Sequence, residues 1–405
     1  MSTDLVVLGS TGSVGTQALD VVAAHRDRYR VRALAAAGGN PGLLAEQALA
    51  HDAEVVAVAD PTAARPLREA LDARGGGARR PEVLAGPQGQ AEVAGMLDAD
   101  GVVLNGVTGS VGLAPTLSAL SSGATLALAN KESLVVGGAL VRAAQRRPGQ
   151  VVPVDSEHSA MAQALRSGRH EKGMASPVVT GRSEVRRLVL TASGGPFRGK
   201  QRGDLAAVTP EQALAHPTWA MGPMVTINSS TLVNKGLELI EAHLLFDVPA
   251  EDIVVVVHPQ SIIHSMVEFH DGSTLAQASP PDMRLPIALG LSWPERLTDV
   301  AVPCRWDEPS AWTFEPVDET VFPAVALARA AAAASATHPA VLNAANEQCV
   351  GAFLAGRLPY LGIVDVVAEV LGEHDGEAAP ALEDLLAAES WARRRADDLL
   401  GRHSA

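Results

Sequence analysis

The chain has 405 residues, of which 47% are hydrophobic and 19% are charged, and its formal net charge is -14. This length exceeds one ordinary hydrophobic core, so we expect two or three domains. The negative charge argues against nucleic acid as a partner, because phosphate backbones need a positive field. Two cysteines, Cys304 and Cys349, are too few for a disulfide framework or a cysteine metal cage. No charged and apolar leader precedes the first predicted strand, and no apolar run approaches about 18 residues, so we expect a cytoplasmic protein without a membrane segment.

Residues 1–153 alternate between short β-rich runs and helical patterns. The β-rich runs are almost continuously apolar, as is typical of parallel strands covered on both faces. The pattern therefore predicts an α/β domain with a Rossmann-like parallel sheet. We expect strands at 4–10, 29–39, 53–60, 81–86, 100–107 and 124–130, helices at 16–28 and 43–52, and a surface connection at 72–82.

The remainder of the chain divides into a central α+β domain, residues 154–300, and a linker with a C-terminal helical bundle, residues 301–405. The apolar periodicity predicts helices of ordinary length in the C-terminal part. In the central part we expect strands at 150–161, 185–193, 224–231, 251–259 and 265–278, a helix at 232–246 and an exposed loop at 166–187. The C-terminal helices are expected at 322–336, 340–356, 363–374 and 381–401.

The stretch "VVLGSTGSVGTQALDVV", residues 6–22, runs from a strand through three glycines into a helix. Gly9, Gly12 and Gly15 permit a tight turn that brings backbone amides close to a phosphate at the helix N-terminus. Many turns are rich in glycine, but this one heads a βα domain, so it predicts a dinucleotide site. Residues 35–40, after the second strand, contain no Asp or Glu to repel a 2′-phosphate, which favours NADPH over NADH.

Asn130, Lys131 and Glu132 follow the predicted strand at 124–130. Ligands of open α/β sheets bind at the carboxyl ends of the strands. Lys131 is therefore a candidate contact for substrate or nicotinamide, although a lysine at such a position is also common on plain surface.

Acidic residues occur in two patterns that could converge on a cation. On an extended chain Asp155 and Glu157 would point to the same face, where two anions need a cation between them. On the predicted helix, Glu238 and Glu241 share a face, three residues after Lys235. Taken alone, the first pair fits a solvated strand edge and the second a solvated helix stripe. Together they would form an oxygen-rich site suited to Mg²⁺ or Mn²⁺.

Two loops complete the candidate site. Ser193 precedes two glycines in a small-residue turn that could bind phosphate. His216, Trp219 and Met221 lie among Pro and Gly, as in a loop that closes over a ligand, although Trp219 could equally pack in the core. The stretch 258–269 contains two further histidines, which we assign to a buried strand without a catalytic role.

Nine motifs together resemble the 1-deoxy-D-xylulose 5-phosphate reductoisomerase family, which makes 2-C-methyl-D-erythritol 4-phosphate in the non-mevalonate route to isoprenoids. They run in family order from residue 9 to residue 347: "GSTGSVG", "ANKESL", "PVDSEHSA", "SGGPFR", "HPTWAMG", "NKGLELIEA", "HPQSIIHSMV", "PDMRLPIA" and "LNAANE". The resemblance implies an NADPH domain, a central catalytic and dimerisation domain, a C-terminal helical bundle and a homodimer.

The resemblance also implies the roles of individual residues. It assigns Mg²⁺ or Mn²⁺, with Co²⁺ as a further candidate, to Asp155, Glu157 and Glu238, and it adds Lys131 and His216 as catalytic residues. It places the sugar phosphate at Lys131, Ser156, Glu157, Ser193, His216, Trp219, Ser229, Asn234, Lys235 and Glu238. It places NADPH at Thr11, Gly12, Ser13, Val14, Gly38, Gly39, Asn40, Asn130, Glu132 and Gly222.

One departure from the family concerns the cofactor. Some members carry a lysine before the asparagine that matches Asn40, where this chain has Gly39, so discrimination against NADH would rest on hydroxyls and backbone amides. Two rival interpretations are weaker. A semialdehyde dehydrogenase would need a nucleophilic cysteine, and both cysteines lie beyond the catalytic region. A regulator that kept the fold without catalysis should have lost the carboxylates or Trp219, and these are present.

Overall fold

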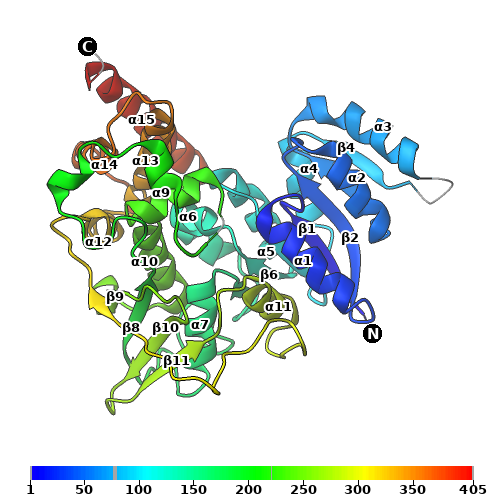
Figure 1. Cartoon of the computed structure of the whole chain (residues 1–405). Helices are drawn as coiled ribbons and strands as arrows, with labels where there is room; N and C mark the ends of the chain where they lie inside the picture. The colour runs from blue at the N-terminus through cyan, green and yellow to red at the C-terminus, as the bar shows by residue number, and fades with distance from the viewer. Residues whose placement is uncertain (1, 76–79, 220, 404–405) are drawn as a thin grey trace.

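The structure is a computed structural model that describes residues 2–75, 80–219 and 221–403. Figure 1 shows the N-terminal sheet with its helices on one side, in blue and cyan. The second sheet, in green, and the C-terminal helices, in orange and red, form the other side. The predicted order of an α/β part, a mixed part and a helical part is therefore confirmed.

The first sheet consists of parallel strands in the order β4-β3-β2-β1-β5-β6-β7. Successive strands move outward from β1 on one side, and the chain then returns to the other side at β5. Ligands of open α/β sheets bind at such a reversal, here beyond the carboxyl ends of β1 and β5. The strands are β1 Thr3–Leu8, β2 Tyr29–Ala36, β3 Val55–Val58, β4 Glu82–Ala85, β5 Val102–Asn105, β6 Thr125–Leu128 and β7 Val151–Pro153.

Helices cover both faces of this sheet, as the apolar strands require. Residues Leu5–Leu8 of β1 are fully buried. The helices are α1 Ser13–Ala24, α2 Pro41–Ala50, α3 Ala64–Arg74, α4 Pro87–Ala94, α5 Leu113–Ser122 and α6 Lys131–Ala144, with short 3₁₀ turns η1 Pro61–Ala63 and η2 Ser110–Gly112. Of the surface connection predicted at 72–82, residues 76–79 lie outside the described residues.

The second sheet is mixed, in the order β11-β10-β8-β9-β12, with only β8 and β9 parallel. Its strands are β8 Val185–Ala192, β9 Ile253–Val257, β10 Ile263–Phe269, β11 Thr274–Ala278 and β12 Glu315–Pro316. The accompanying helices are α7 Ser156–Leu165, α8 Pro210–Leu214, α9 Pro223–Ser230, α10 Val233–Phe246 and α11 Arg284–Ser292, with η3 Arg202–Leu205 and η4 Ala250–Asp252. Helix α7 packs on β10 and β11, and α10 packs on α6.

Two predictions of local structure in the central part are wrong. The strand expected at 224–231 is helix α9, whose first turn is set by the fixed φ of Pro223 despite the β-branched residues that follow. The strand expected at 150–161 ends at Pro153. Asp155 caps the N-terminus of α7 by accepting a hydrogen bond from the Ser156 backbone N–H, and Glu157 lies in the first turn of that helix.

The C-terminal part consists of α12 Ala324–Ala334, α13 His338–Leu354, α14 Gly362–Gly372 and α15 Leu382–His403, which confirms the predicted helices. The largely buried α13 contacts the other three and also reaches α6 and α9. It therefore joins the helical part to both sheet regions. Within the described residues, no helix has the length and apolar character needed to cross a membrane.

The glycine turn yields a first prediction, for Gly15→Ala. A Cβ atom at Gly15 would lie 2.3 Å from the Gly9 carbonyl oxygen and 2.4 Å from the Ser10 Cα, both in backbone that cannot give way easily. We expect unfolding free energy to fall by about 1–3 kcal/mol, as for other overpacked sites. Because the turn must shift, dinucleotide affinity should fall at least tenfold, roughly. Denaturant unfolding and a dinucleotide fluorescence titration measure the two effects.

Gly351→Ala is the matched control, because a Cβ at Gly351 in α13 meets no atom within 4 Å. It should stabilise the protein slightly, by up to about 1 kcal/mol, through the better helix propensity of Ala. Normal dinucleotide affinity in Gly15→Ala would contradict the interpretation of the turn.

Candidate functional site

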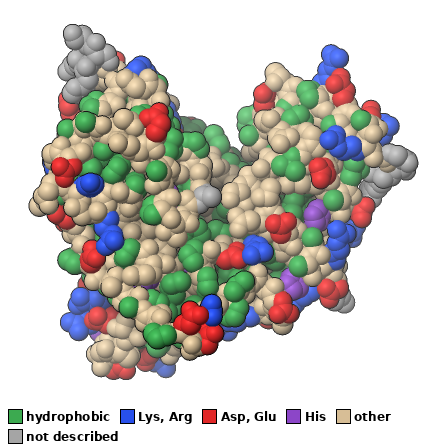
Figure 2. Space-filling model, viewed as in Figure 1, with side chains coloured by type: hydrophobic (Ala, Val, Ile, Leu, Met, Phe, Trp, Pro, Cys, Tyr) green, Lys and Arg blue, Asp and Glu red, His purple; other side chains and the backbone are tan. Residues whose placement is uncertain are grey.

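A cavity of about 980 Å³ joins the two sheet regions. Its wall includes the glycine turn at Gly12–Val14, the starts of α6, α7 and β10, the end of β8, and one face of α10. Figure 2 shows the molecule hollowed between the N-terminal part and the rest. The predicted dinucleotide turn and the predicted acidic residues therefore open into one space.

Three carboxylates meet on one wall of this cavity. Oxygen atoms of Asp155, Glu157 and Glu238 all lie within 4.8 Å of one another. Asp155 and Glu157 come from the N-terminal end of α7, and Glu238 from the second turn of α10. The structure thus brings together the residues of both acidic patterns, although the first pair stands on a helix terminus and not on an extended strand.

Two ammonium groups lie among these carboxylates. Lys131 Nζ contacts Asp155 and lies 2.9 Å from Glu238 Oε1. Lys235 Nζ lies 2.7 Å from Glu157 Oε1 and also contacts Glu238. Glu238 further accepts a hydrogen bond of 2.5 Å from the Asn234 side-chain amide. The two ammonium groups therefore neutralise part of the negative charge of the three carboxylates, which lowers the cost of burying them.

Burial and neighbouring charges together set the pKa values in this cluster. Burial and the Glu157 charge raise the pKa of Glu238 above its ordinary value. Burial also disfavours ionised Glu157, but Lys235 outweighs it and holds the pKa of that carboxyl well below the usual range. Burial disfavours the ammonium of Lys131, yet Asp155 and Glu238 raise its pKa well above the ordinary value. The cluster therefore favours the presence of positive charge.

This donor set fits a divalent cation. Three carboxylates within reach of one point are the hard oxygen ligands that Mg²⁺ and Mn²⁺ prefer. In the metal-free cluster, the ammonium groups of Lys131 and Lys235 supply the positive charge beside Glu238. A divalent ion that replaced them at the carboxylates would leave Lys131 and Lys235 free to contact an anionic ligand in the same cavity.

His216 links the two serines expected at the phosphate end. Its Nδ1 accepts hydrogen bonds from the backbone N–H groups of Thr218, at 3.1 Å, and Trp219, at 2.9 Å. Nε2 therefore carries the hydrogen and faces the hydroxyl oxygens of Ser193 and Ser229, each at 3.2 Å. Burial lowers the pKa of His216, which also favours this neutral form. His216 thus lies between the hydroxyl groups of Ser193 and Ser229 and links them.

Trp219 lies in the wall of the cavity and outside the hydrophobic core. Trp219 and Met221 line the cavity, and Trp219 is only half-buried. Its ring meets the ring of His264 edge-on, with centroids 6.3 Å apart. The alternative of Trp219 as a core residue is therefore excluded by its position, and the side chain is placed to cover a ligand.

At the dinucleotide end, the structure separates the predicted residues into two groups. Those that line the cavity are Gly12, Ser13, Val14, Glu132 and Gly222. Thr11, Gly38, Gly39, Asn40 and Asn130 lie outside its wall. Asn130 does not line the cavity, but it hydrogen-bonds to Glu132, which does.

The amide of Asn130 donates to the Gly109 carbonyl oxygen at 3.0 Å and to Glu132 at 2.8 Å. Asn40 caps α2 by accepting from the Leu43 N–H, and no atom lies within 4 Å of a Cβ added at Gly39. Gly39 therefore leaves open space beside the start of α2.

Several lining residues escaped the sequence analysis. Gly106, Val107 and Thr108 follow β5 directly, and Asp282 and Arg284 precede or begin α11. The first three could have been found from the strand pattern alone, because β5 is the strand beside β1 at the reversal of the sheet. Ser261 and His264 lie in or beside a strand that we had assigned only to the core.

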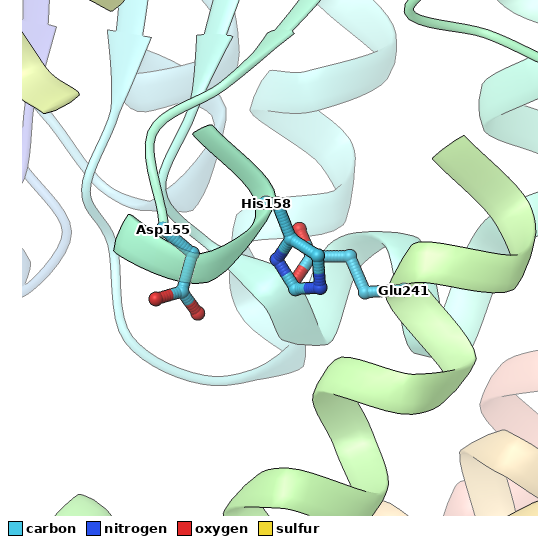
Figure 3. A group of neighbouring side chains, drawn as sticks. All are labelled: Asp155, His158 and Glu241. Carbon is cyan, nitrogen blue, oxygen red and sulfur yellow. The ribbon is translucent and has the colours of Figure 1, made fainter. Parts of the chain in front are cut away.

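A second group of ionisable residues lies behind the carboxylates. His158 and Glu241 are fully buried, and Figure 3 shows them side by side between α7 and α10, next to Asp155. His158 Nδ1 lies 3.1 Å from Glu241 Oε2, and Nε2 lies 2.8 Å from the backbone oxygen of Glu238. Burial opposes the charge, but Glu241 outweighs it and raises the pKa of His158 to about 9. This ion pair holds the two carboxylate-bearing helices together.

Comparisons with known proteins cover almost the whole chain. Residues 5–138 match the family described as 1-deoxy-D-xylulose 5-phosphate reductoisomerase, residues 151–246 match its C-terminal domain, and residues 278–395 match the domain described as DXP reductoisomerase C-terminal domain. The reductoisomerase of Beutenbergia cavernae is 65% identical over 398 residues, 98% of this chain and 97% of the relative. That of Streptomyces coelicolor is 57% identical over 400 residues, 98% of this chain and 92% of the relative.

Solved structures agree with these relatives. The Zymomonas mobilis reductoisomerase in complex with NADPH superposes with a TM-score of 0.86 at 39% identity, and the match covers 99% of each chain. A reductoisomerase in complex with NADPH, fosmidomycin and magnesium gives a TM-score of 0.86 at 32% identity, with 98% of each chain covered.

The charge balance of the cluster predicts how Lys131→Met behaves. Removing this ammonium leaves Asp155 and Glu238 short of a counter-charge, so the metal-free protein should lose about 3 kcal/mol of unfolding free energy, as when a buried ion pair is broken. Added Mg²⁺ should then raise the melting temperature of the variant more than that of the wild type, because the ion supplies the positive charge that Asp155 and Glu238 have lost. Thermal melts with and without Mg²⁺ measure this difference.

Lys200→Met, at an exposed position, is the control and should leave both the stability and its Mg²⁺ dependence unchanged. An equal Mg²⁺ effect in Lys131→Met and wild type would show that Lys131 and the ion do not share a place.

Proposed function

The chain belongs to the 1-deoxy-D-xylulose 5-phosphate reductoisomerase family, and we propose how its residues carry out the reaction of that family. It is an NADPH- and metal-dependent oxidoreductase of isoprenoid synthesis. The reaction rearranges and reduces 1-deoxy-D-xylulose 5-phosphate to 2-C-methyl-D-erythritol 4-phosphate. The proposal rests on one observation: the acidic cluster, the phosphate-type donors and the glycine turn all face one cavity. We also propose the division into residues 1–153, 154–300 and 301–405 as NADPH, catalytic and helical domains.

We propose that the sugar phosphate enters with its phosphate toward α9 and α10. Hydroxyl, amide and ammonium donors from Ser193, Ser229, Asn234 and Lys235 line that end, and such donors suit a phosphate dianion. His216 supports them from behind, because its Nε2–H lies between the two hydroxyl groups. Substrate binding is then favoured by local donors in a protein whose net charge is negative.

The other end of the substrate lies at the carboxylates in this proposal. Asp155, Glu157 and Glu238 hold the metal, which when bound polarises the ketone and hydroxyl oxygens of the sugar, and NADPH supplies the hydride. Lys131, which contacts Asp155 and Glu238 in the metal-free cluster, turns to donate to substrate oxygens. The Ser156 hydroxyl, now a donor to Glu157 at 2.5 Å, orients that carboxylate and borders the substrate.

We propose that NADPH lies along the glycine turn and reaches the substrate beside the start of α6. Thr11, Gly12, Ser13 and Val14 would receive its phosphates, with the ribose near Gly38, Gly39 and Asn40 and the nicotinamide near Asn130, Glu132 and Gly222. Trp219 also lines the cavity, so closure of its loop over the ligands would exclude water from the hydride transfer.

The assay follows NADPH absorbance with 1-deoxy-D-xylulose 5-phosphate, with and without Mg²⁺ or Mn²⁺, and then with NADH. Glu238→Gln should lower kcat by at least about 100-fold while the thermal melt stays cooperative, because a charged ligand with contacts to both lysines is lost. The product is identified by mass and NMR spectroscopy.

Glu211→Gln, at an exposed position of α8, is the control and should retain full activity. Metal-independent turnover by the wild type, or near-normal turnover by Glu238→Gln in saturating Mg²⁺, would contradict the proposed role of the carboxylates.

The homodimer and the cytoplasmic location stay predictions. An exposed apolar patch, Val302 and Trp306, supports the dimer: these side chains are 71% and 74% exposed, although the chain has only five tryptophans. The Trp306 ring packs against Trp312 at 6.0 Å. Large exposed aromatic residues of this kind are typical of subunit interfaces.

Trp306→Ser should shift the protein from dimer to monomer, because the substitution removes the largest apolar side chain of the patch. Sedimentation velocity at several protein concentrations measures the shift. A monomeric wild type, or an unchanged dimer in the variant, would exclude this patch as the interface.

A further inference from the structure

A linker joins the second sheet to the helical part and runs along the edge of that sheet. Within this linker, residues 311–316 run beside β9, where Figure 1 shows them in yellow ahead of α12. Glu315 and Pro316 of β12 pair antiparallel with Val257 and Val256 of β9. The linker is therefore attached at the point where β9 ends and the turn 258–263 begins.

His258 connects this linker to the turn. Its buried Nε2 accepts hydrogen bonds from the backbone N–H groups of Ile262 and Ile263, both at 3.1 Å. Nδ1 therefore carries the ring hydrogen and donates to the Thr313 carbonyl oxygen at 2.9 Å. The ring of Phe314 stacks on the imidazole, with centroids 4.6 Å apart and an interplanar angle of 15°. Each polar atom and one face of the ring are thus occupied.

The turn that His258 holds forms part of the cavity wall. Ser261 and Ile263 line the cavity, and the next residue, His264, contacts the ring of Trp219. Ser261 has a φ of +52°, a left-handed conformation that a serine adopts at a cost. Such a conformation persists where the surroundings fix it, and the two hydrogen bonds accepted by His258 lie directly after Ser261.

Two further contacts attach the linker to the substrate loops. The Gln260 side-chain amide donates to the Thr313 hydroxyl at 3.0 Å. Glu315 pairs with Arg198, at 2.9 Å, and Arg198 belongs to the loop that begins at Ser193. The linker therefore holds both loops that border the proposed phosphate end, one through His258 and one through Arg198.

We propose that His258 is a positioning residue for substrate binding: it fixes the turn 258–263 and is itself fixed by Thr313 and Phe314 of the linker. The proposal rests on the proposed assignment of the phosphate end to this side of the cavity. His258 does not touch the reacting atoms, since both ring nitrogens hydrogen-bond to the backbone and one face of the ring stacks on Phe314. Its loss should weaken sugar phosphate binding and leave NADPH binding intact.

Two isosteric substitutions separate the functions of the two ring nitrogens. In His258→Asn the amide can replace Nδ1 but cannot reach the N–H groups of Ile262 and Ile263. In His258→Gln the amide oxygen can replace Nε2, while the donor to Thr313 is lost. We expect the KM for the sugar phosphate to rise about tenfold in His258→Asn and about threefold in His258→Gln, in keeping with the loss of one or two hydrogen bonds of a buried ring. The kcat and the NADPH Kd should change less than about twofold.

Phe314→Ala tests the same connection while His258 itself stays unchanged, because it removes only the ring that stacks on the imidazole. Phe314 is 43% exposed, so its removal should not unfold the chain. It should raise the KM for the sugar phosphate about threefold. Leu386→Ala, an exposed apolar position on α15, is the control and should behave as wild type. Calorimetric titration of the sugar phosphate in the presence of Mg²⁺ gives its Kd independently of turnover.

Wild-type values for substrate KM and Kd in all three variants would overturn the proposal. So would a parallel loss of NADPH and substrate affinity, since a general structural role would produce it. An inactive wild type would refute the proposed function, whereas the calorimetric differences between variants would still decide the role of His258.

Discussion

The site depends on the burial of three carboxylates beside two ammonium groups where α6, α7 and α10 meet. Such an arrangement stabilises the fold little, because removing several charges from water costs about as much as their mutual attraction returns. Its chemistry fits the binding of a divalent cation better than a role in stability. Glu238 contacts both lysines at once, so any cation that binds it must displace one or both of them. In the function proposed above, a divalent cation would take the place of this bound ammonium.

The surrounding elements serve to hold these charges at fixed distances. The N-terminus of α7 presents Asp155 as its cap, and the His158–Glu241 ion pair locks that helix against α10. Helix α6 starts at Lys131, immediately beyond the carboxyl end of β6. The charges thus rest on helix starts that are themselves fixed by a sheet edge or a buried ion pair, which limits their freedom to rearrange.

The sequence predicted the parallel sheet, the glycine turn and the identity of the acidic residues because each has a strong local pattern. It misplaced Asp155 and Glu157 on a strand, because i and i+2 carboxylates look alike on a strand and at a helix start. It missed helix α9, where β-branched residues were overridden by Pro223 and by tertiary packing of Ile227. The contact of His258 with the linker could not be predicted, since Thr313 lies 55 residues away in the chain.

The negative net charge of the protein poses a problem for a sugar phosphate substrate, and the cluster offers a solution. While Lys131 and Lys235 are paired with carboxylates, little positive charge is available to attract a phosphate dianion. A divalent cation at the carboxylates would release both ammonium groups, because it would pair with Asp155, Glu157 and Glu238 in their place. Metal binding would then increase the affinity for substrate through Lys131 and Lys235, although neither lysine binds the metal. Since linkage is reciprocal, bound sugar phosphate should in turn tighten the binding of the metal.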